Sequence, residues 1–305
     1  MRSVWQQLDR SRPVFVLLQI FVLLASLVVN LGQTAQPAFA AALTVNSLAD
    51  SAVSGDGLCT LREALDNANA DAELTGGDCA AGSGADTITV SVDGVIDLTG
   101  ALPDLTTDIN LTGPGADRLT VRRASGGSYR LFTISGSATV ALAGLTIENG
   151  DSGTDGGGLY NDAATLTLSG VAVRDNVGTG DGGGLYNNGG TVIITASTFS
   201  GNQANGGANG GAIFNGGGSV SLTNSTLSGN SAAFRGGALA TFFSGTLDLN
   251  NVTITDNSAV TSGGGVFVNA DSGPATLGNT LVAGNTAPAG TDVSGVLASA
   301  GNNLI

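Results

Sequence analysis

The stretch that decides the fold reads Gly-Gly-Gly-Leu-Tyr-Asn at residues 156–161, and a related stretch returns four times before residue 290. Each copy carries a glycine doublet, and successive doublets begin 26, 28, 26 and 27 residues apart. The doublets are Gly156-Gly157, Gly182-Gly183, Gly210-Gly211, Gly236-Gly237 and Gly263-Gly264. Self-similarity at a period of roughly 20 to 50 residues is typical of a solenoid or an array of small units.

Three ladders of equivalent residues keep the register of the doublets. The first apolar ladder is Leu159, Leu185, Ile213, Leu239 and Val266, and the second is Leu168, Ile194, Leu222, Leu249 and Leu277. The polar ladder is Asn176, Asn202, Asn230, Asn257 and Asn285. Asn tolerates left-handed turn geometry, and its amide can bond the equivalent Asn one coil away, so we interpret the polar ladder as structural.

Each unit holds three short runs in which apolar and polar residues alternate, as at 165–168 and 252–255. Alternation predicts strands with one face inward. Such runs become stable when each pairs with the same run of the next unit. We therefore predict an all-β fold, a parallel β-helix with coils of 26–28 residues. A propeller is the alternative, but its blades need about 40 residues and four strands each.

The first 40 residues have a different character. Three Arg precede an apolar run at 14–31, and Ala38-Phe39-Ala40 follows. This order predicts a secretory signal peptide over residues 1–40 and a mature chain that starts at Ala41. An uncleaved membrane anchor is the alternative. No later apolar stretch approaches the length that spans a bilayer.

The chain is acidic, with a net charge of −14 and neither Lys nor His. Without residues 1–40, seven Arg stand against 23 acidic residues, a net charge of −16. Nucleic acid and anionic membrane surfaces repel such a chain, so we expect neither as a partner.

One helix is predicted in the mature chain, within residues 59–69. Thr60 and Glu63 have the spacing of a capping box. The helix has one apolar stripe, formed by Leu61, Ala64, Leu65 and Ala68. We predict that it covers the open first coil, whose core would otherwise face water.

Cys59 and Cys79 are the only cysteines and bracket this helix. A disulfide is expected between them in an exported chain, because export passes through an oxidising compartment. Metal binding is the alternative, but two thiolates without any His make a weak site.

The predicted organisation after the signal peptide is a cap at 41–83, irregular first coils at 84–137, regular coils at 138–290, and a further coil or C-terminal segment at 291–305. The irregular coils are predicted from the apolar pairs Ile88/Val90, Ile96/Leu98, Ile109/Leu111, Leu119/Val121 and Leu131/Ile134. We also expect the sequence to be a truncated copy of a longer protein; the competing expectation is that the last coil pairs with a partner or a second copy.

A family resemblance becomes specific at the cap. The run DGLCTLREA at 56–64, with Cys79 and the run DTI at 86–88, resembles the signature of exported bacterial β-helix proteins named after their Cys-Ser-Leu-Arg-Glu-Ala-Ile motif. This chain has Thr60 and Leu65 where that motif has Ser and the last Ile. The run GGAI at 210–213 is similar to the repeats of polymorphic outer-membrane proteins. The resemblance covers nearly all of residues 42–305. It implies a right-handed helix of the pectin-lyase-like class, secreted or held at the bacterial surface or outer membrane.

Aromatic residues form a file next to the first apolar ladder. Its positions are Tyr160, Tyr186, Phe214, Ala240 and Phe267, so the file is broken at Ala240. Aromatic rings at strand spacing can bind sugar rings, and they can also stack on one another to cover a sheet. We favour stacking, with ligand binding as the alternative.

A second file precedes the doublets and consists of Asp155, Asp181, Asn209, Arg235 and Ser262. Two carboxylates about 4.8 Å apart repel each other unless a cation lies between them. Asp155 and Asp181 are therefore the best candidates for calcium ligands, the only cofactor considered. The simpler interpretation, which we favour, is two solvated carboxylates in a loop.

Catalysis is the less favoured hypothesis for the function of this chain. A polysaccharide lyase of this fold class needs a calcium-binding acidic cluster and a basic residue, and without Lys or His only Arg174 and Arg235 are candidates; Arg235 is the better one. Hydrolases need two or three convergent carboxylates, and Asp175 and Asp256, at neighbouring places in units one and four, do not obviously converge. We therefore predict a noncatalytic surface or extracellular module, adhesin-like or glycan-binding, whose partner is a polysaccharide or another surface protein. The alternative is a calcium-dependent polysaccharide lyase.

Overall fold

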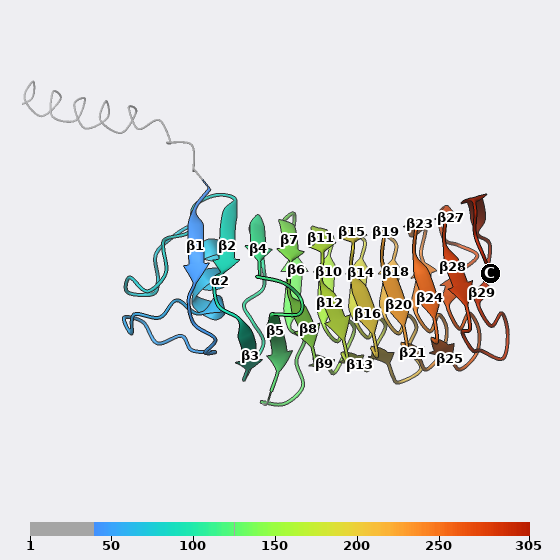
Figure 1. Ribbon diagram of the computed structural model, residues 1–305, viewed down its shortest axis with the longest axis horizontal. Coiled ribbons are helices and arrows are strands. Elements are labelled where there is room, and N and C mark those ends of the chain that lie inside the picture. Colours follow the sequence, from blue (N-terminus) through green and yellow to red (C-terminus); the bar gives the residue numbers. More distant parts are fainter. Residues whose placement is uncertain (1–39, 125) are drawn as a thin grey trace, which may run out of the picture. The chain divides into compact units, whose positions relative to one another are not determined.

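The computed structural model describes residues 40–124 and 126–305, which lie in one compact unit from Ala40 to Ile305 (Figure 1). The predicted signal peptide lies outside the described residues, apart from Ala40. Within the unit the chain winds through stacked coils, and the strands of each coil pair in parallel with those of the next. The predicted parallel β-helix is confirmed.

Four sheets, named A to D here, run along the described part of the solenoid. Sheet A is the longest and extends from the cap to the last coil. Its strands, in spatial order, are β1 (Ala42–Val45), β2 (Asp86–Val90), β4 (Ile109–Thr112), β7 (Thr139–Ala143), β11 (Thr165–Ser169), β15 (Thr191–Thr195), β19 (Ser219–Thr223), β23 (Thr246–Asn250), β27 (Ala275–Gly278) and β30 (Ala298–Gly301).

Sheets B and C complete the walls of the coils. Sheet B consists of β3 (Gly94–Leu98), β5 (Leu119–Arg123), β8 (Thr146–Glu148), β12 (Ala172–Arg174), β16 (Thr198–Ser200), β20 (Thr226–Ser228), β24 (Thr253–Thr255) and β28 (Leu281–Ala283). Sheet C consists of β6 (Phe132–Ser135), β10 (Leu159–Asp162), β14 (Leu185–Asn188), β18 (Ile213–Gly216), β22 (Leu239–Phe242), β26 (Val266–Val268) and β29 (Val293–Ser294).

Sheet D was not predicted. The three short runs of each unit predict three strands per coil, and this is wrong for the regular coils because a fourth strand follows sheet B. These strands are only two residues long and show no alternation: β9 (Asp151–Ser152), β13 (Val177–Gly178), β17 (Gln203–Ala204), β21 (Ser231–Ala232) and β25 (Ser258–Ala259).

The core is a stack of equivalent side chains in register. Leu159 pairs with Leu185 in sheet C, and Leu168 pairs with Ile194 in sheet A. Both predicted apolar ladders are confirmed over their full length, and every member is buried. The apolar pairs predicted for the first coils are buried as well. Burying one Leu or Ile side chain stabilises the fold by about 1.5–3 kcal/mol, so each coil is held mainly by the next.

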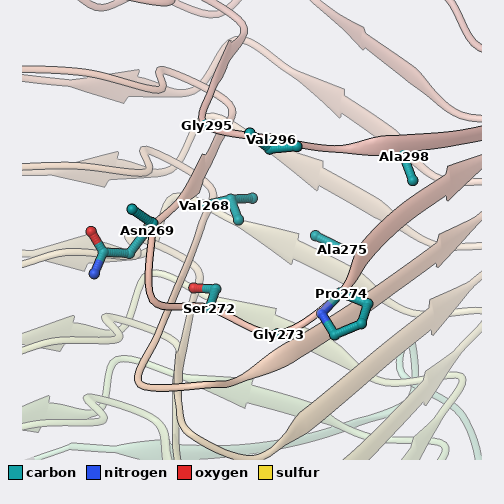
Figure 2. A pocket seen from close by; sticks show the side chains of 10 residues that line it. Val268, Asn269, Ser272, Gly273, Pro274, Ala275, Gly295, Val296 and Ala298 are labelled. Atoms are coloured by element: carbon teal, nitrogen blue, oxygen red, sulfur yellow. The ribbon is translucent and has the colours of Figure 1, made fainter.

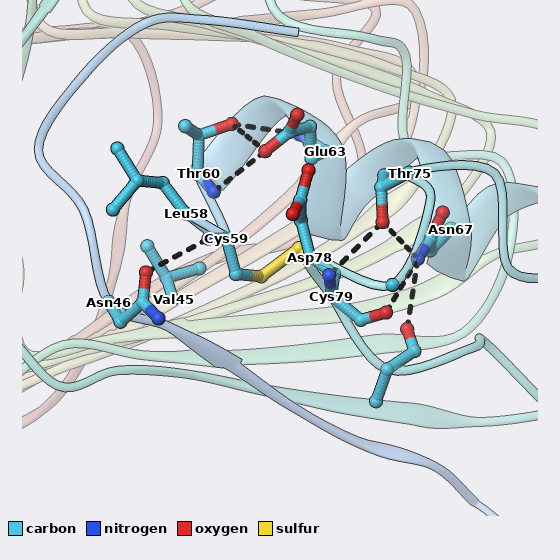
Figure 3. Close-up of a disulfide and its surroundings, with 12 residues drawn as sticks. Val45, Asn46, Leu58, Cys59, Thr60, Glu63, Asn67, Thr75, Asp78 and Cys79 are labelled. Carbon is cyan, nitrogen blue, oxygen red and sulfur yellow. Dashed lines mark hydrogen bonds between the residues drawn. A yellow bond between two sulfur atoms is a disulfide. The ribbon is translucent and has the colours of Figure 1, made fainter. Parts of the chain in front are cut away.

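The cap also has the predicted form. Helix α2 (Leu61–Ala70) begins after Thr60, whose side chain accepts from the N–H of Glu63, while Glu63 accepts from the N–H of Thr60. The apolar stripe is buried in the core cluster that includes β1 and β2. The predicted disulfide joins Cys59 to Cys79 beside the helix (Figure 3).

The last coil comes from residues after 290, as expected for a further coil. Strand β29 pairs with β26, and β30 pairs with β27. Its apolar residues are poorly covered, since Val296, Leu304 and Ile305 are all exposed.

Candidate functional site

The predicted Asn ladder lies in the interior between sheets B and D. The Nδ2 atom of each Asn donates to Oδ1 of the Asn one coil further, over 2.9 Å at all four steps. The same Oδ1 atoms also accept the backbone N–H of the preceding Asn. One part of the prediction is wrong, because the left-handed residue is not Asn but the one before it, such as Asp175 with φ 56°. The ladder is structural, as expected.

A second ladder of buried amides was not predicted. Asn161 donates to Oδ1 of Asn187 over 2.8 Å, and Asn187 donates to Oδ1 of Asn215 over 2.9 Å. The file continues to Thr241, whose hydroxyl accepts from Asn215. The signal was present in the sequence, since Asn161 and Asn187 end the two Gly-Gly-Gly-Leu-Tyr-Asn stretches.

The aromatic file is continuous rather than broken. The rings of Tyr160, Tyr186 and Phe214 stack with centroids 5.2 and 5.1 Å apart. The break expected at Ala240 is closed by Phe242, whose ring lies 5.4 Å from those of Phe214 and Phe267. Phe242 stands two positions after Ala240, so its side chain projects from the same face of β22.

The stacked rings have few open faces. Phe214 is 2% exposed and Phe267 is 8% exposed. Arg130 lies 4.5 Å from the ring centre of Tyr160, and Arg235 covers the ring of Phe267 at 4.9 Å. The rings therefore contact one another and guanidinium groups, and ligand binding by this file stays a prediction.

Burial also changes the chemistry of the tyrosines. Burial, and after it the negative charge of Asp155, raises the pKa of Tyr186 to about 12. Burial raises the pKa of Tyr160 as well. Both phenols are therefore neutral hydrogen-bonding groups at physiological pH.

The file before the doublets is vertically aligned, as predicted, and its carboxylates are hydrogen-bonded. Oδ1 of Asp155 accepts the backbone N–H of Asp181 over 2.8 Å. Oδ1 of Asp181 accepts the backbone N–H and the side-chain amide of Asn209 over 2.6 and 2.9 Å. Burial raises the pKa of Asp181, and the nearby Asp155 raises it further, against the bonds from Asn209. These carboxylates are neither fully solvated nor free of protein partners.

The remaining catalytic candidates do not converge. Arg174 forms an ion pair with Glu148 at 3.4 Å. Arg235 is half-buried and stacks on Phe234 as well as Phe267. Across residues 40–124 and 126–305, no group of three or more His, Cys, Asp or Glu side chains comes together to hold a metal ion.

The corner between sheets C and A carries a hollow of about 480 Å³ at the end of the solenoid formed by the last coils (Figure 2). Its walls are the loop after β26 and the segment before β30. Val268, Pro274 and Val296 give it apolar surface, and Asn269 and Ser272 stand on its loop wall. The loop is fixed from behind, because Ser272 donates to the carbonyl of Thr241 over 2.8 Å.

The same loop bonds to the turn that contains Phe243, the residue that directly follows Phe242 of the aromatic file. Asp271 accepts the backbone N–H of Phe243 at 3.3 Å through Oδ1 and that of Ser244 at 2.8 Å through its carbonyl. The side chain of Phe243 is 62% exposed. Phe243 and Ser244 both have left-handed backbone, with φ of 52° and 63°. Gly189 and Gly217 occupy the position of Phe243 in the two preceding coils.

Comparisons of this chain with protein-family models, with curated proteins and with solved structures find no match. Among the residues that the structure describes, no helix has both the length and the apolar character needed to cross a bilayer.

Proposed function

We propose that this chain is an exported, noncatalytic β-solenoid that works as a rigid binding module, adhesin-like, secreted or displayed at the bacterial surface. Its proposed partner is a polysaccharide, bound at the corner formed by Phe243 and the adjacent hollow.

The observation that carries this proposal is the conformation of Phe243. A bulky residue at positive φ is a rare and strained choice, and such strain clusters at functional sites. Glycine would be free of this strain and is used in the two preceding coils. The exposed ring of Phe243 and the hollow lie on opposite sides of the 269–274 loop, which bonds to the Phe243 turn. An exposed ring together with a hollow that has apolar and polar walls suits a polysaccharide, which presents C–H faces to rings and hydroxyls to polar groups.

The negative charge of the chain limits the class of polysaccharide that can bind. With a net charge of −14, the protein repels strongly acidic polymers. A neutral or weakly charged polysaccharide therefore fits this corner better than a polyuronate.

The remaining chemistry supports a scaffold rather than a catalyst. The carboxylates of Asp155 and Asp181, suggested as calcium ligands, accept N–H groups of the next coil. The guanidinium group of Arg235 lies over the rings of Phe234 and Phe267. The outer face of sheet B adds a file of alternating charge along the axis, made of Asp97, Arg122, Glu148 and Arg174. Polar groups that cross-link coils in this way favour a stiff rod.

The test is a glycan array with the purified chain, followed by affinity measurements for each glycan that binds. We expect Phe243→Gly to weaken binding about tenfold or more, as for a central aromatic contact, while the melting temperature stays equal or rises because glycine suits this backbone. Val260→Ala is the matched control, since Val260 is equally exposed on another turn. Unchanged binding by the Phe243→Gly chain overturns the proposed site.

A second measurement tests the absence of catalysis. Acidic polysaccharides are incubated with the chain and calcium, and the absorbance of unsaturated products is followed. We expect no signal. A signal that disappears in the Arg235→Ala variant overturns the noncatalytic proposal in favour of a lyase.

A further inference from the structure

Asp86, the first residue of β2, carries a buried carboxylate with only one bonded oxygen. The side chain is 1% exposed. Its Oδ1 accepts the backbone N–H groups of Ser83 and Ala41 over 2.9 and 3.1 Å. Its Oδ2 is buried and has no hydrogen-bond partner.

This arrangement is costly for an acidic chain. Burial raises the pKa of Asp86, the two N–H bonds lower it, and the nearby Asp71 raises it again. No ion pair within the described ranges involves Asp86. A buried carboxylate without a cation destabilises the fold unless a positive group approaches it.

One of the two donors to Asp86, Ala41, stands directly after the predicted cleavage site. Ala41 follows directly on Ala38-Phe39-Ala40, which has the small residues that leader-cleaving peptidases accept. We propose that Asp86 is the receptor for the α-ammonium group that hydrolysis of the Ala40–Ala41 bond creates. This inference does not rest on the proposed binding function.

The hydrolysis step supplies the missing cation. An endopeptidase selective for small side chains adds one water across the peptide bond, so that Ala40 leaves with a carboxylate and the nitrogen of Ala41 becomes a primary amine. The amine takes up a proton at neutral pH, since the pKa of an α-amino group is about 7.7–8.0. One peptide N–H is thereby replaced by three N–H donors on the same nitrogen.

The geometry around Ala41 fits this change. Its nitrogen already lies 3.1 Å from Oδ1, and Oδ2 belongs to the same carboxylate, so we expect a second N–H of the ammonium to reach Oδ2. Its carbonyl accepts the N–H of Thr87 over 2.8 Å, which holds Ala41 in register with β2. Ala40 is exposed, so the bond to be cut lies on the outer side of this contact.

The result is a cap that is completed by processing. Ala41 packs against the core and leads into β1, on which α2 lies. In the uncut chain Asp86 remains buried with a half-satisfied carboxylate. In the cut chain the new terminus and Asp86 neutralise each other, which fixes the first strand of sheet A.

The test uses residues 41–305, which are the compact unit Ala40–Ile305 without Ala40 and contain all described elements. The chain is prepared with a free Ala41 and with Nα-acetylated Ala41, each with and without Asp86→Asn. We expect acetylation to lower the melting temperature by several degrees in the parent chain and to have almost no effect beside Asp86→Asn. Asp104→Asn, an exposed carboxylate, is the matched control and leaves the effect of acetylation intact.

Two further readouts keep the proposal falsifiable if Asp86→Asn fails to fold. The pKa of the Ala41 amine, followed by nitrogen NMR, should lie above 7.7–8.0 in the parent chain. The full chain, exported from a bacterial host, should yield a product whose intact mass corresponds to a start at Ala41. An ordinary amine pKa, equal effects of acetylation in both backgrounds, a different first residue or a retained leader each overturn the proposal.

Discussion

Phe242 fills the level of the aromatic stack that Ala240 leaves empty, with its ring 5.4 Å from each neighbouring ring. Both residues project from the same face of β22, so the chain keeps an unbroken column of rings although the repeat is interrupted. This relationship indicates that the column matters for stability more than the residue at any one position.

The contribution of the ring column to stability can be tested by moving the ring from position 242 to position 240. Phe242→Ala should destabilise the fold by about 3 kcal/mol through loss of a packed ring. Adding Ala240→Phe to the same chain should recover most of the loss, because the equivalent position holds Phe214 one coil earlier. Urea unfolding of the single and double variants measures both effects. A double variant no more stable than Phe242→Ala would show that position 240 cannot hold a ring.

A substitution in the buried Asn ladder should lower the free energy of unfolding far more than a substitution of a surface Asn. Asn230→Ala removes the acceptor for Asn202 and the donor to Asn257, which leaves buried groups unpaired. We expect a loss on the order of 3 kcal/mol in the free energy of unfolding. Asn205→Ala, at an exposed site in the same turn region, should change it by less than about 0.5 kcal/mol. Equal effects would contradict the structural role of the ladder.

Reduction of the disulfide should loosen one end of the solenoid. The bond closes a loop of 20 residues, and such a loop is worth roughly 3 kcal/mol in the chain-entropy model. Hydrogen exchange in β1 and α2 should therefore accelerate in reductant before that in β23, and unfolding should spread coil by coil. Identical protection of residues 42–110 with and without reductant would count against this order.

The half-buried carboxylate of Asp181 should make stability depend on pH. Burial raises its pKa above 3.8, so the folded state holds a proton that the unfolded state has already lost. Stability linked to this group is therefore greatest below the ordinary pKa and falls as pH rises through the raised value. Asp181→Asn should remove this fall and be more stable than the parent at neutral pH, since its Oδ1 still accepts from Asn209. Urea unfolding between about pH 3 and 7 measures this, with exposed Asp256→Asn as control; a parent-like pH profile would refute it.

Calcium should leave the fold unchanged. Oδ1 of Asp155 and Oδ1 of Asp181 are engaged by N–H donors of the following coil. We expect the same melting temperature with calcium and with a chelator, measured by calorimetry. A rise on addition of calcium that is absent in Asp155→Asn would restore the calcium site considered from the sequence.

The solenoid could be predicted because equivalent residues recur at a nearly constant spacing along the sequence. Spacing between equivalent residues fixes which strands pair, and alternation fixes which side chains face inward, so Leu159 and Leu168 were placed correctly. The cap was predictable for a different reason, since Thr60 and Glu63 form a purely local motif.

The missed features depend on departures from the repeat or on long-range contacts. Phe242 was overlooked because only equivalent positions were compared. The strain at Phe243 arises because a bulky residue stands at a position whose backbone is left-handed in the preceding coils as well, at Ala163, Gly189 and Gly217, and spacing alone does not describe backbone angles. Asp86 lies 45 residues from Ala41 in sequence, and only the pairing of β1 with β2 brings them together.

The direction of the coil-to-coil hydrogen bonds has a mechanical consequence. These bonds run along the axis, so tension between the two ends loads every coil-to-coil interface equally, and the interfaces, formed by strands of at most five residues in the described ranges, open one after another. Each coil of about 26 residues that opens releases up to about 90 Å of chain at about 3.4 Å per residue. A solenoid of this kind lengthens in small steps under a pull and absorbs work at each one.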